Sequence, residues 1–199
     1  MPACQGAHPR RIPMSLFRHA TFEISAAQPG GLPPPAGAEI AFAGRSNSGK
    51  SSAINTLAGH TRLAFVSKTP GRTQLINLFR MKNGAALVDL PGYGYAQVSR
   101  KESRGWASFI DPYLSARDQL VLVVVLVDST IPIQPGDMEM VQWLRTMNRP
   151  FLIAATKLDK IGPAAVQELL TGELGLSVTV AARCLQLATI SAADESFAD

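Results

Sequence analysis

The chain has 199 residues, 46% of them hydrophobic and 17% charged, which is enough to bury one core and too few for two large domains. Its longest apolar run, residues 120–127, is only strand-sized, and the N-terminus has no apolar signal region, so we expect neither a membrane-spanning nor a secreted protein. Because Cys4 and Cys184 lack metal-ligand spacing, we expect reduced thiols in a cytoplasmic protein. We expect residues 1–19 to be a disordered lead-in and residues 20–199 to form one domain.

The first half of the chain predicts a strand, a glycine-rich loop and a helix in immediate succession. Residues 20–25 alternate weakly and predict an edge strand, which a Pro/Gly-rich connector follows. EIAFA, residues 39–43, predicts a short buried strand, and SAINTLAG, residues 52–59, predicts a helix. The loop between them, GRSNSGKSS at residues 44–52, fits the pattern G-x-x-x-x-G-K-[ST].

This glycine-rich loop predicts a phosphate-binding site. Its backbone N–H groups and the N-terminus of the following helix would form a positive cradle for phosphates. Gly44 and Gly49 permit the turn. Lys50 can reach the β- and γ-phosphates, and the Ser51 hydroxyl is placed to ligate Mg²⁺. The alternative is an ordinary turn between a strand and a helix.

A predicted hairpin follows and ends in a carboxylate. Residues 74–82 and 85–90 predict two antiparallel strands joined by a two-residue turn at Asn83–Gly84. The second strand places Asp89 at its carboxyl end, which is the edge where an α/β sheet binds its ligand. Asp89 therefore occupies the position of a Walker-B carboxylate that holds Mg²⁺, and its alternative role is to cap a loop.

Two polar loops flank this hairpin. Residues 59–73 and 91–99 are too polar and too rich in turn-forming residues for regular elements, so both predict mobile loops with functional content. Thr73 in the first loop could complete the Mg²⁺ shell only when a γ-phosphate is bound. Gly92 in the second loop brings a backbone N–H towards the γ-phosphate with no side chain in the way.

The second half alternates helices and strands. The β-branched run 120–128 predicts a central parallel strand buried on both faces, and residues 150–160 predict another. Helices are predicted at 100–114, at 138–147 and from residue 162, and a final strand at 184–192. The side chains predicted to face inwards are Trp106, Phe109, Ile110, Tyr113, Met138, Val141, Trp143 and Leu144.

This order of elements predicts an α/β fold, a three-layer α/β/α sandwich whose mostly parallel sheet has one antiparallel edge strand. One more helix would normally cover the final strand. Because the chain stops seven residues after Ala192, we expect that helix to be absent or supplied otherwise.

TKLD, residues 156–159, predicts which base is bound. The carboxylate of Asp159 can accept both N–H donors on the Watson–Crick edge of guanine, whereas adenine would leave a buried carboxylate unpaired. Lys157 would lay its aliphatic stem along the purine face. The alternative for the tetrapeptide alone is a turn at a strand end. In this order after the phosphate loop, we interpret it as the guanine-binding motif [N/T]-K-x-D.

The ordered set GRSNSGKSS, KTPGRTQLIN, DLPGYGYA, TKLD and SA resembles the EngB/YsxC/YihA branch of the translation-factor-type GTPases, over about residues 20–192. KTPGRTQ and DLPGYGYA are specific to that branch. The resemblance implies a P-loop GTPase domain that binds GTP or GDP, with Mg²⁺ held by Ser51, Thr73 and Asp89. It also implies nucleotide contacts from Gly44, Arg45, Ser46, Asn47, Ser48, Gly49, Lys50 and Ser51, from Gly71, Arg72, Thr73, Gln74 and Leu75, from Asp89, Leu90, Pro91 and Gly92, and from Thr156, Lys157, Leu158, Asp159, Ile190, Ser191 and Ala192.

The resemblance further implies a molecular switch in assembly of the large ribosomal subunit that is needed for normal cell division and septation. The charge distribution is in keeping with a polyanionic partner such as RNA. Residues 44–105 carry ten Lys and Arg against two acids, a local charge of +8 within a net charge of +4. The alternative is a solvated basic face. We expect a monomer without membrane contact.

Hydrolysis of GTP is expected to be slow. Lys50, Thr73, Gly92 and Asn47 are the candidate catalytic residues. Tyr93 stands where the water-orienting glutamine of other GTPases follows the glycine, and it cannot position water as a carboxamide does. Asn47 could hold K⁺ beside the phosphates, and its alternative role is to stabilise the loop as a turn residue.

Two other functions use the same loop. A metabolic NTPase or kinase would need an acceptor pocket with a catalytic base, and the sequence offers no candidate besides the switch residues. The other is a nucleotide-binding protein with little turnover, for which Tyr93 would be the reason.

Overall fold

The computed structural model describes residues 17–64, 75–94, 100–162 and 164–165. The continuous β-branched run forms a central strand, as predicted from its lack of a polar face. The described strands are β1 (Thr21–Ala26), β2 (Glu39–Gly44), β3 (Ile76–Arg80), β4 (Ala86–Asp89), β5 (Leu120–Asp128) and β6 (Phe151–Thr156). The described helices are α1 (Lys50–Ala58), α2 (Arg100–Ala116) and α3 (Pro135–Thr146), with short 3-10 turns η2 (Pro29–Gly31) and η3 (Leu158–Lys160).

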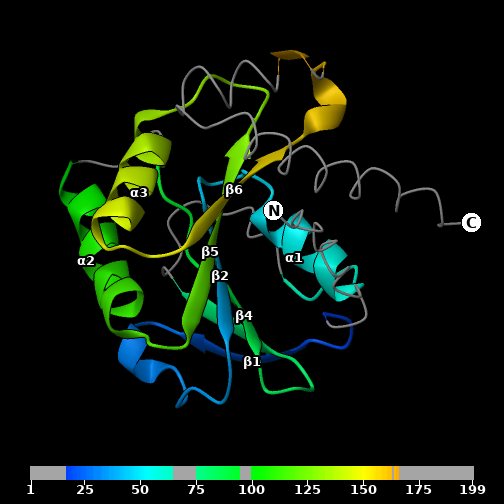
Figure 1. The fold of residues 1–199 in the computed structure, drawn as a ribbon, viewed down its shortest axis with the longest axis vertical. Helices are drawn as coiled ribbons and strands as arrows, with labels where there is room; N and C mark the ends of the chain where they lie inside the picture. The colour runs from blue at the N-terminus through cyan, green and yellow to red at the C-terminus, as the bar shows by residue number, and fades with distance from the viewer. Residues whose placement is uncertain (1–16, 65–74, 95–99, 163, 166–199) are drawn as a thin grey trace, which may run out of the picture.

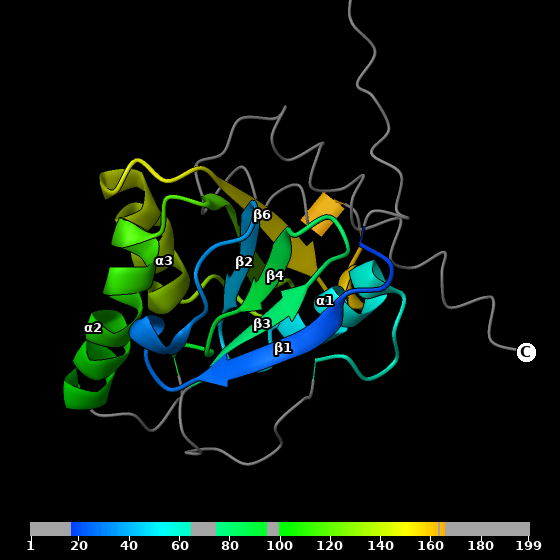
Figure 2. The same ribbon diagram turned by 90° about the horizontal axis from the view of Figure 1, so that it is seen from below.

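The six described strands form one mostly parallel sheet in the order β1-β3-β4-β2-β5-β6 (Figures 1 and 2). Strand β3 runs antiparallel to both of its neighbours, and the other pairings are parallel. The predicted fold class is confirmed. The antiparallel strand lies one position in from the edge, because β1 pairs outside it. Residues 164–165 of the helix predicted from residue 162 are helical, and the rest of that helix and the predicted final strand lie outside the described residues.

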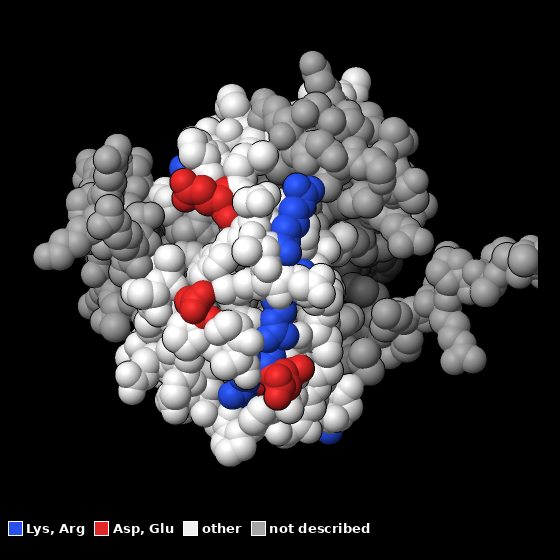
Figure 3. Space-filling model, turned by 60° about the vertical axis from the view of Figure 1, so that its left-hand side comes forward, with Lys and Arg blue, Asp and Glu red and all other residues white. Residues whose placement is uncertain are grey.

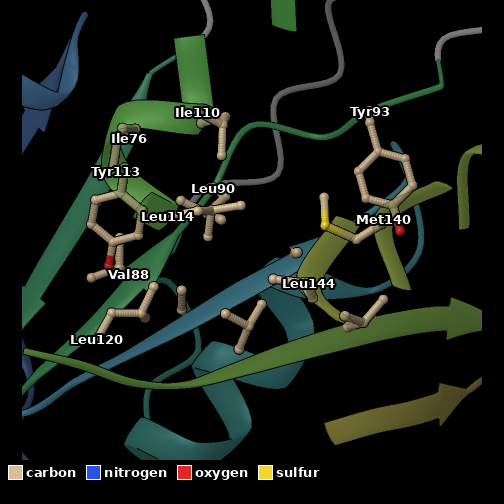
Figure 4. Close-up of a cluster of buried hydrophobic side chains, with 14 of the residues drawn as sticks. Ile76, Val88, Leu90, Tyr93, Ile110, Tyr113, Leu114, Leu120, Met140 and Leu144 are labelled. Atoms are coloured by element: carbon tan, nitrogen blue, oxygen red, sulfur yellow. The ribbon is translucent and has the colours of Figure 1, made fainter. Parts of the chain in front are cut away.

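Helices cover both faces of the sheet, which gives the predicted three layers (Figures 1 and 2). Helix α1 packs on one face, where Ile54 and Phe42 belong to one buried cluster. Helices α2 and α3 pack on the other face, and the larger cluster there includes Ile110, Leu114 and Leu144 (Figure 4). None of the helices in the described residues is long and apolar enough to cross a membrane.

Two details of the sequence prediction are wrong. The loop between β3 and β4 has three residues, Lys82–Gly84, because the Met81 N–H bonds to the Ala85 carbonyl at 2.8 Å and Gly84 has a positive φ. On α3, Met138 is 41% exposed and Met140 is buried instead. The cause is the packing of this helix against α2 and β5, which the sequence pattern alone does not fix.

A buried ion pair fastens the start of β2 to the end of α2, at the opposite end of the sheet from the phosphate loop. The Glu39 side chain is fully buried, and Arg117 donates to both of its oxygens, at 2.7 Å to Oε1 and 3.0 Å to Oε2. The Tyr113 hydroxyl donates to Oε2 at 3.1 Å. Burial raises the pKa of Tyr113 well above its usual range, and the hydrogen bond to Glu39 raises the pKa of Arg117. These contacts neutralise the carboxylate inside the core.

Candidate functional site

The predicted motifs meet at one edge of the sheet. Strands β2, β4, β5 and β6 are parallel, so their carboxyl ends lie together, and they end at Gly44, Asp89, Asp128 and Thr156. This edge of a parallel sheet, next to a helix N-terminus, is where α/β proteins bind phosphorylated ligands.

The glycine-rich loop wraps around the Lys50 side chain. Lys50 Nζ donates to the Gly44 carbonyl at 3.2 Å and lies 3.5 Å from the Arg45 carbonyl. Burial lowers the pKa of Lys50, and the nearby charge of Asp89 partly offsets this effect. Asn47 has a φ of +65° and Gly49 a φ of +89°, so two residues of the loop adopt the left-handed conformation. The Asn47 backbone is thus that of a turn residue, as in the simpler of its two predicted roles.

Asp89 is buried at the end of β4 with one oxygen unused. Its side chain is 8% exposed, and Oδ1 makes no hydrogen bond to any described residue. Burial raises the pKa of Asp89 to about 6, and the charge of Lys50 opposes the rise. An oxygen that is both buried and unpartnered is costly, so it indicates a position where a ligand is accepted.

The second predicted loop begins in direct contact with the first. A Cβ atom on Gly92 would lie 3.0 Å from the Ser46 nitrogen and 3.3 Å from Lys50 Nζ, so any side chain here would be crowded. The Ser46 N–H donates to the Tyr93 carbonyl at 3.2 Å, and the Tyr93 N–H donates to the Gly44 carbonyl at 3.4 Å. Gly92 is therefore held beside the lysine of the phosphate loop.

TKLD is joined to the phosphate loop through its first residue. Thr156 Oγ1 donates to the Ser48 carbonyl at 2.8 Å, and a Cβ on Gly49 would lie 3.5 Å from the Thr156 methyl group. Lys157 forms an ion pair with Asp128, which stands beside Thr156 in the sheet register. Asp159 is exposed in η3, so a bound base would have to cover it.

Asp128 contacts the predicted base-binding segment through Lys157, and sequence reasoning gave it no such place. Burial would raise its pKa, but hydrogen bonds from Lys157 and Thr130 hold the pKa of this carboxyl below its usual range. The ion pair fixes the Lys157 side chain on which the base was predicted to lie. The sequence did contain a signal for this contact, because Asp128 ends strand β5 at the same edge of the sheet as the other motifs.

A second missed residue lies on α1. Asn55 accepts the Ala64 N–H at 2.7 Å and donates to the Ala64 carbonyl at 3.1 Å, so one side chain holds both polar groups of that backbone position. Ala64 lies within the first predicted loop, residues 59–73, of which residues 65–73 are outside the described residues. Among the predicted site residues, Gly71, Arg72, Thr73, Gln74, Ile190, Ser191 and Ala192 lie outside the described residues.

Comparison with known proteins identifies the class of nucleotide. Residues 39–157 match the family model described as "50S ribosome-binding GTPase". The chain is 57% identical over 174 residues to the probable GTP-binding protein EngB of Azoarcus sp. strain BH72, covering 84% of this chain and 83% of that protein. This chain belongs to the EngB family of GTP-binding proteins. A further EngB relative, from Aromatoleum aromaticum, is 59% identical over 148 residues, or 74% of this chain and 68% of that protein.

The fold of a solved family member agrees. The crystal structure of a probable GTP-binding protein engB superposes with a TM-score of 0.59 at 28% identity, covering 73% of this chain and 85% of that chain. Membership of the EngB family makes this protein a guanine-nucleotide-binding protein of a GTPase family. The predictions of the family and of GTP binding are thereby confirmed.

Proposed function

We propose that this protein is a slow GTPase that acts as a switch in assembly of the large ribosomal subunit, in the cytoplasm and as a monomer, and that cell division and septation depend on this role. The family description and the curated EngB relatives support the GTPase part of this proposal. The observation that supports a switch most strongly is the contact between the two loops. Gly92 lies against Ser46 and Lys50, where its backbone can respond to a γ-phosphate.

Magnesium fits the proposed site. The buried Asp89 Oδ1 without a partner is a suitable oxygen ligand for a hard cation, and the Ser51 hydroxyl stands in the first turn of α1. We propose that Ser51, Asp89 and Thr73 hold Mg²⁺, which neutralises phosphate charge when it is bound. Lys50 and the backbone N–H groups of residues 44–51 bind the phosphates, and Asp159 and Lys157 bind the guanine.

The orientation of Tyr93 supports slow hydrolysis. Its hydroxyl donates to Asp137 Oδ1 on α3 at 3.0 Å, and the side chain is only 7% exposed. The residue that follows Gly92 is thus directed into the core and cannot orient an attacking water. The remaining catalytic contributions are positioning and charge neutralisation by Lys50, Gly92 and Thr73.

We propose that K⁺ bound at Asn47 assists hydrolysis. A cation beside the phosphates would supply the positive charge that an arginine provides in other GTPases. Single-turnover hydrolysis should therefore be faster in K⁺ than in Na⁺ at equal ionic strength. Equal rates in the two salts would leave Asn47 as a turn residue only.

The large ribosomal subunit is the proposed partner. The described side chains of the face that Figure 3 shows are mainly uncharged, with a few acidic and basic ones scattered among them. We therefore place the contact at the nucleotide side, where the loops change with the bound nucleotide.

Co-sedimentation tests this proposal. With purified 50S subunits, the wild-type protein should pellet with the non-hydrolysable analogue GMPPNP and much less with GDP. Binding should weaken as salt rises if phosphate contacts to RNA contribute. Equal recovery with both nucleotides, or none with either, would contradict a GTP-dependent ribosomal switch.

A further inference from the structure

A buried contact joins the second loop to the outer helices. Tyr93 follows Gly92 directly, and its ring reaches across to α3 beside Met140 (Figure 4). Its hydroxyl donates to Asp137 Oδ1 at 3.0 Å, although the two residues are 44 positions apart in sequence. A Cβ on Gly136 would lie 3.3 Å from the Tyr93 ring, so the glycine makes room for it.

Asp137 is well suited to hold this hydroxyl. Its side chain is 3% exposed, and its second oxygen accepts the Gln134 N–H at 3.2 Å, which caps the first turn of α3. The helix N-terminus favours a negative charge at this position. Both carboxylate oxygens are therefore used, one by the helix and one by Tyr93.

Helix α2 holds the same loop from another side. Trp106 Nε1 donates to the Pro91 carbonyl at 3.0 Å, and the indole meets the Tyr93 ring edge-on with centroids 5.4 Å apart. The residues on both sides of Gly92 are thus tied to the outer helices. The Tyr93 backbone is tied to Gly44 and Ser46 of the phosphate loop at the same time.

We propose that the Tyr93–Asp137 and Trp106–Pro91 hydrogen bonds form a latch that positions the Gly92 backbone for the γ-phosphate. Tyr93, Asp137 and Trp106 are positioning residues in this proposal, because they act through Gly92 and touch no nucleotide. The latch rests on the proposed function, since it concerns recognition of the γ-phosphate. It gives the tyrosine a role at a position where other GTPases carry a water-orienting glutamine.

GDP lacks the γ-phosphate, so it provides an internal reference. Loss of the latch should weaken GMPPNP binding and leave GDP binding almost unchanged. In Tyr93→Phe, the dissociation constant for GMPPNP divided by that for GDP should rise roughly two- to tenfold, which is the effect of one lost hydrogen bond. We call this quotient the nucleotide ratio. Asp137→Asn should act in the same direction, because its single oxygen can replace only one of the two carboxylate oxygens, and its NH2 group can at best donate weakly to the Tyr93 hydroxyl.

Tyr113→Phe is the matched control. It removes the same hydroxyl from a buried tyrosine–carboxylate pair, Tyr113 and Glu39, at the opposite end of the sheet. Both phenylalanine variants should lose comparable thermal stability, but only Tyr93→Phe should change the nucleotide ratio. In the double variant Tyr93→Phe/Asp137→Asn, the nucleotide ratio should rise no further than in the more strongly affected single variant, because both changes break the same hydrogen bond.

The decisive experiment measures GMPPNP and GDP affinity, together with single-turnover GTP hydrolysis, for the wild type and these variants. A higher ratio and slower hydrolysis in Tyr93→Phe and Asp137→Asn alone would support the latch. An unchanged ratio in Tyr93→Phe would overturn it. If the wild-type protein hydrolysed no GTP, the proposed hydrolysis would be overturned. The latch would still be supported if the nucleotide ratio rose in Tyr93→Phe.

Discussion

Replacing Asp159 with asparagine should transfer the base preference of this protein from guanine to xanthine. The carboxylate can accept both N–H donors of the guanine edge, whereas an asparagine offers one acceptor and one donor. Xanthine carries a carbonyl where guanine carries its amino group, so it matches the asparagine. Sites that leave such hydrogen bonds unmade discriminate by up to about 10⁴-fold, and we expect a change of the affinity ratio of that order. Titration calorimetry with GDP and xanthosine diphosphate measures it.

Asp118→Asn provides the control for that exchange. Asp118 is exposed between α2 and β5, at the opposite edge of the sheet, and it undergoes the same loss of charge. Its nucleotide preference should equal that of the wild type. If Asp159→Asn kept the guanine preference of the wild type, Asp159 would not be the base-reading residue.

Removing the Glu39 side chain should have the largest effect on stability. Glu39→Ala leaves the buried Tyr113 hydroxyl without its acceptor and the partly buried Arg117 guanidinium without its carboxylate. Breaking one side of a buried pair costs about 3–5 kcal/mol. For a domain of this size, this corresponds to a decrease of roughly 6–20 °C in the midpoint of thermal unfolding. Denaturant titration of the two proteins measures the free energy of unfolding directly.

Glu23→Ala is the comparison for this loss. Glu23 pairs with Arg80 on the edge strands at 2.6 Å, but its side chain is 34% exposed. A pair that is partly in water contributes less than about 1 kcal/mol. If Glu39→Ala and Glu23→Ala lost the same free energy of unfolding, burial of the Glu39 pair would not increase its contribution to stability.

The core of the site could be predicted because its chemistry is local in sequence. Residues 44–51 combine glycines, a lysine and a serine at fixed spacing, and the structure places them between a strand and a helix as predicted. Asp89 and Thr156 were found because each ends a strand, and parallel strands bring their carboxyl ends together. Their binding roles stay predictions, because no nucleotide contact is described.

What the sequence did not reveal depends on contacts between distant elements. Asp137 looks like an ordinary residue of a helix start, and nothing local indicates that it is buried against Tyr93. Asp128 finds its partner Lys157 just after the neighbouring strand β6, 29 positions away. The exchange of Met138 for Met140 in the core has the same origin, because the packing of α3 decides which face points inwards.

The measurement that tests the central claim most directly is the affinity of the wild-type protein for GDP and GTP against ADP and ATP, in the presence of Mg²⁺. The site predicts strong binding of both guanine nucleotides and at least about a hundredfold weaker binding of both adenine nucleotides, because adenine leaves hydrogen bonds of the base-reading carboxylate unmade. Equal affinity for the two bases would contradict a guanine site at residues 156–159 and leave only a general phosphate-loop nucleotide-binding protein.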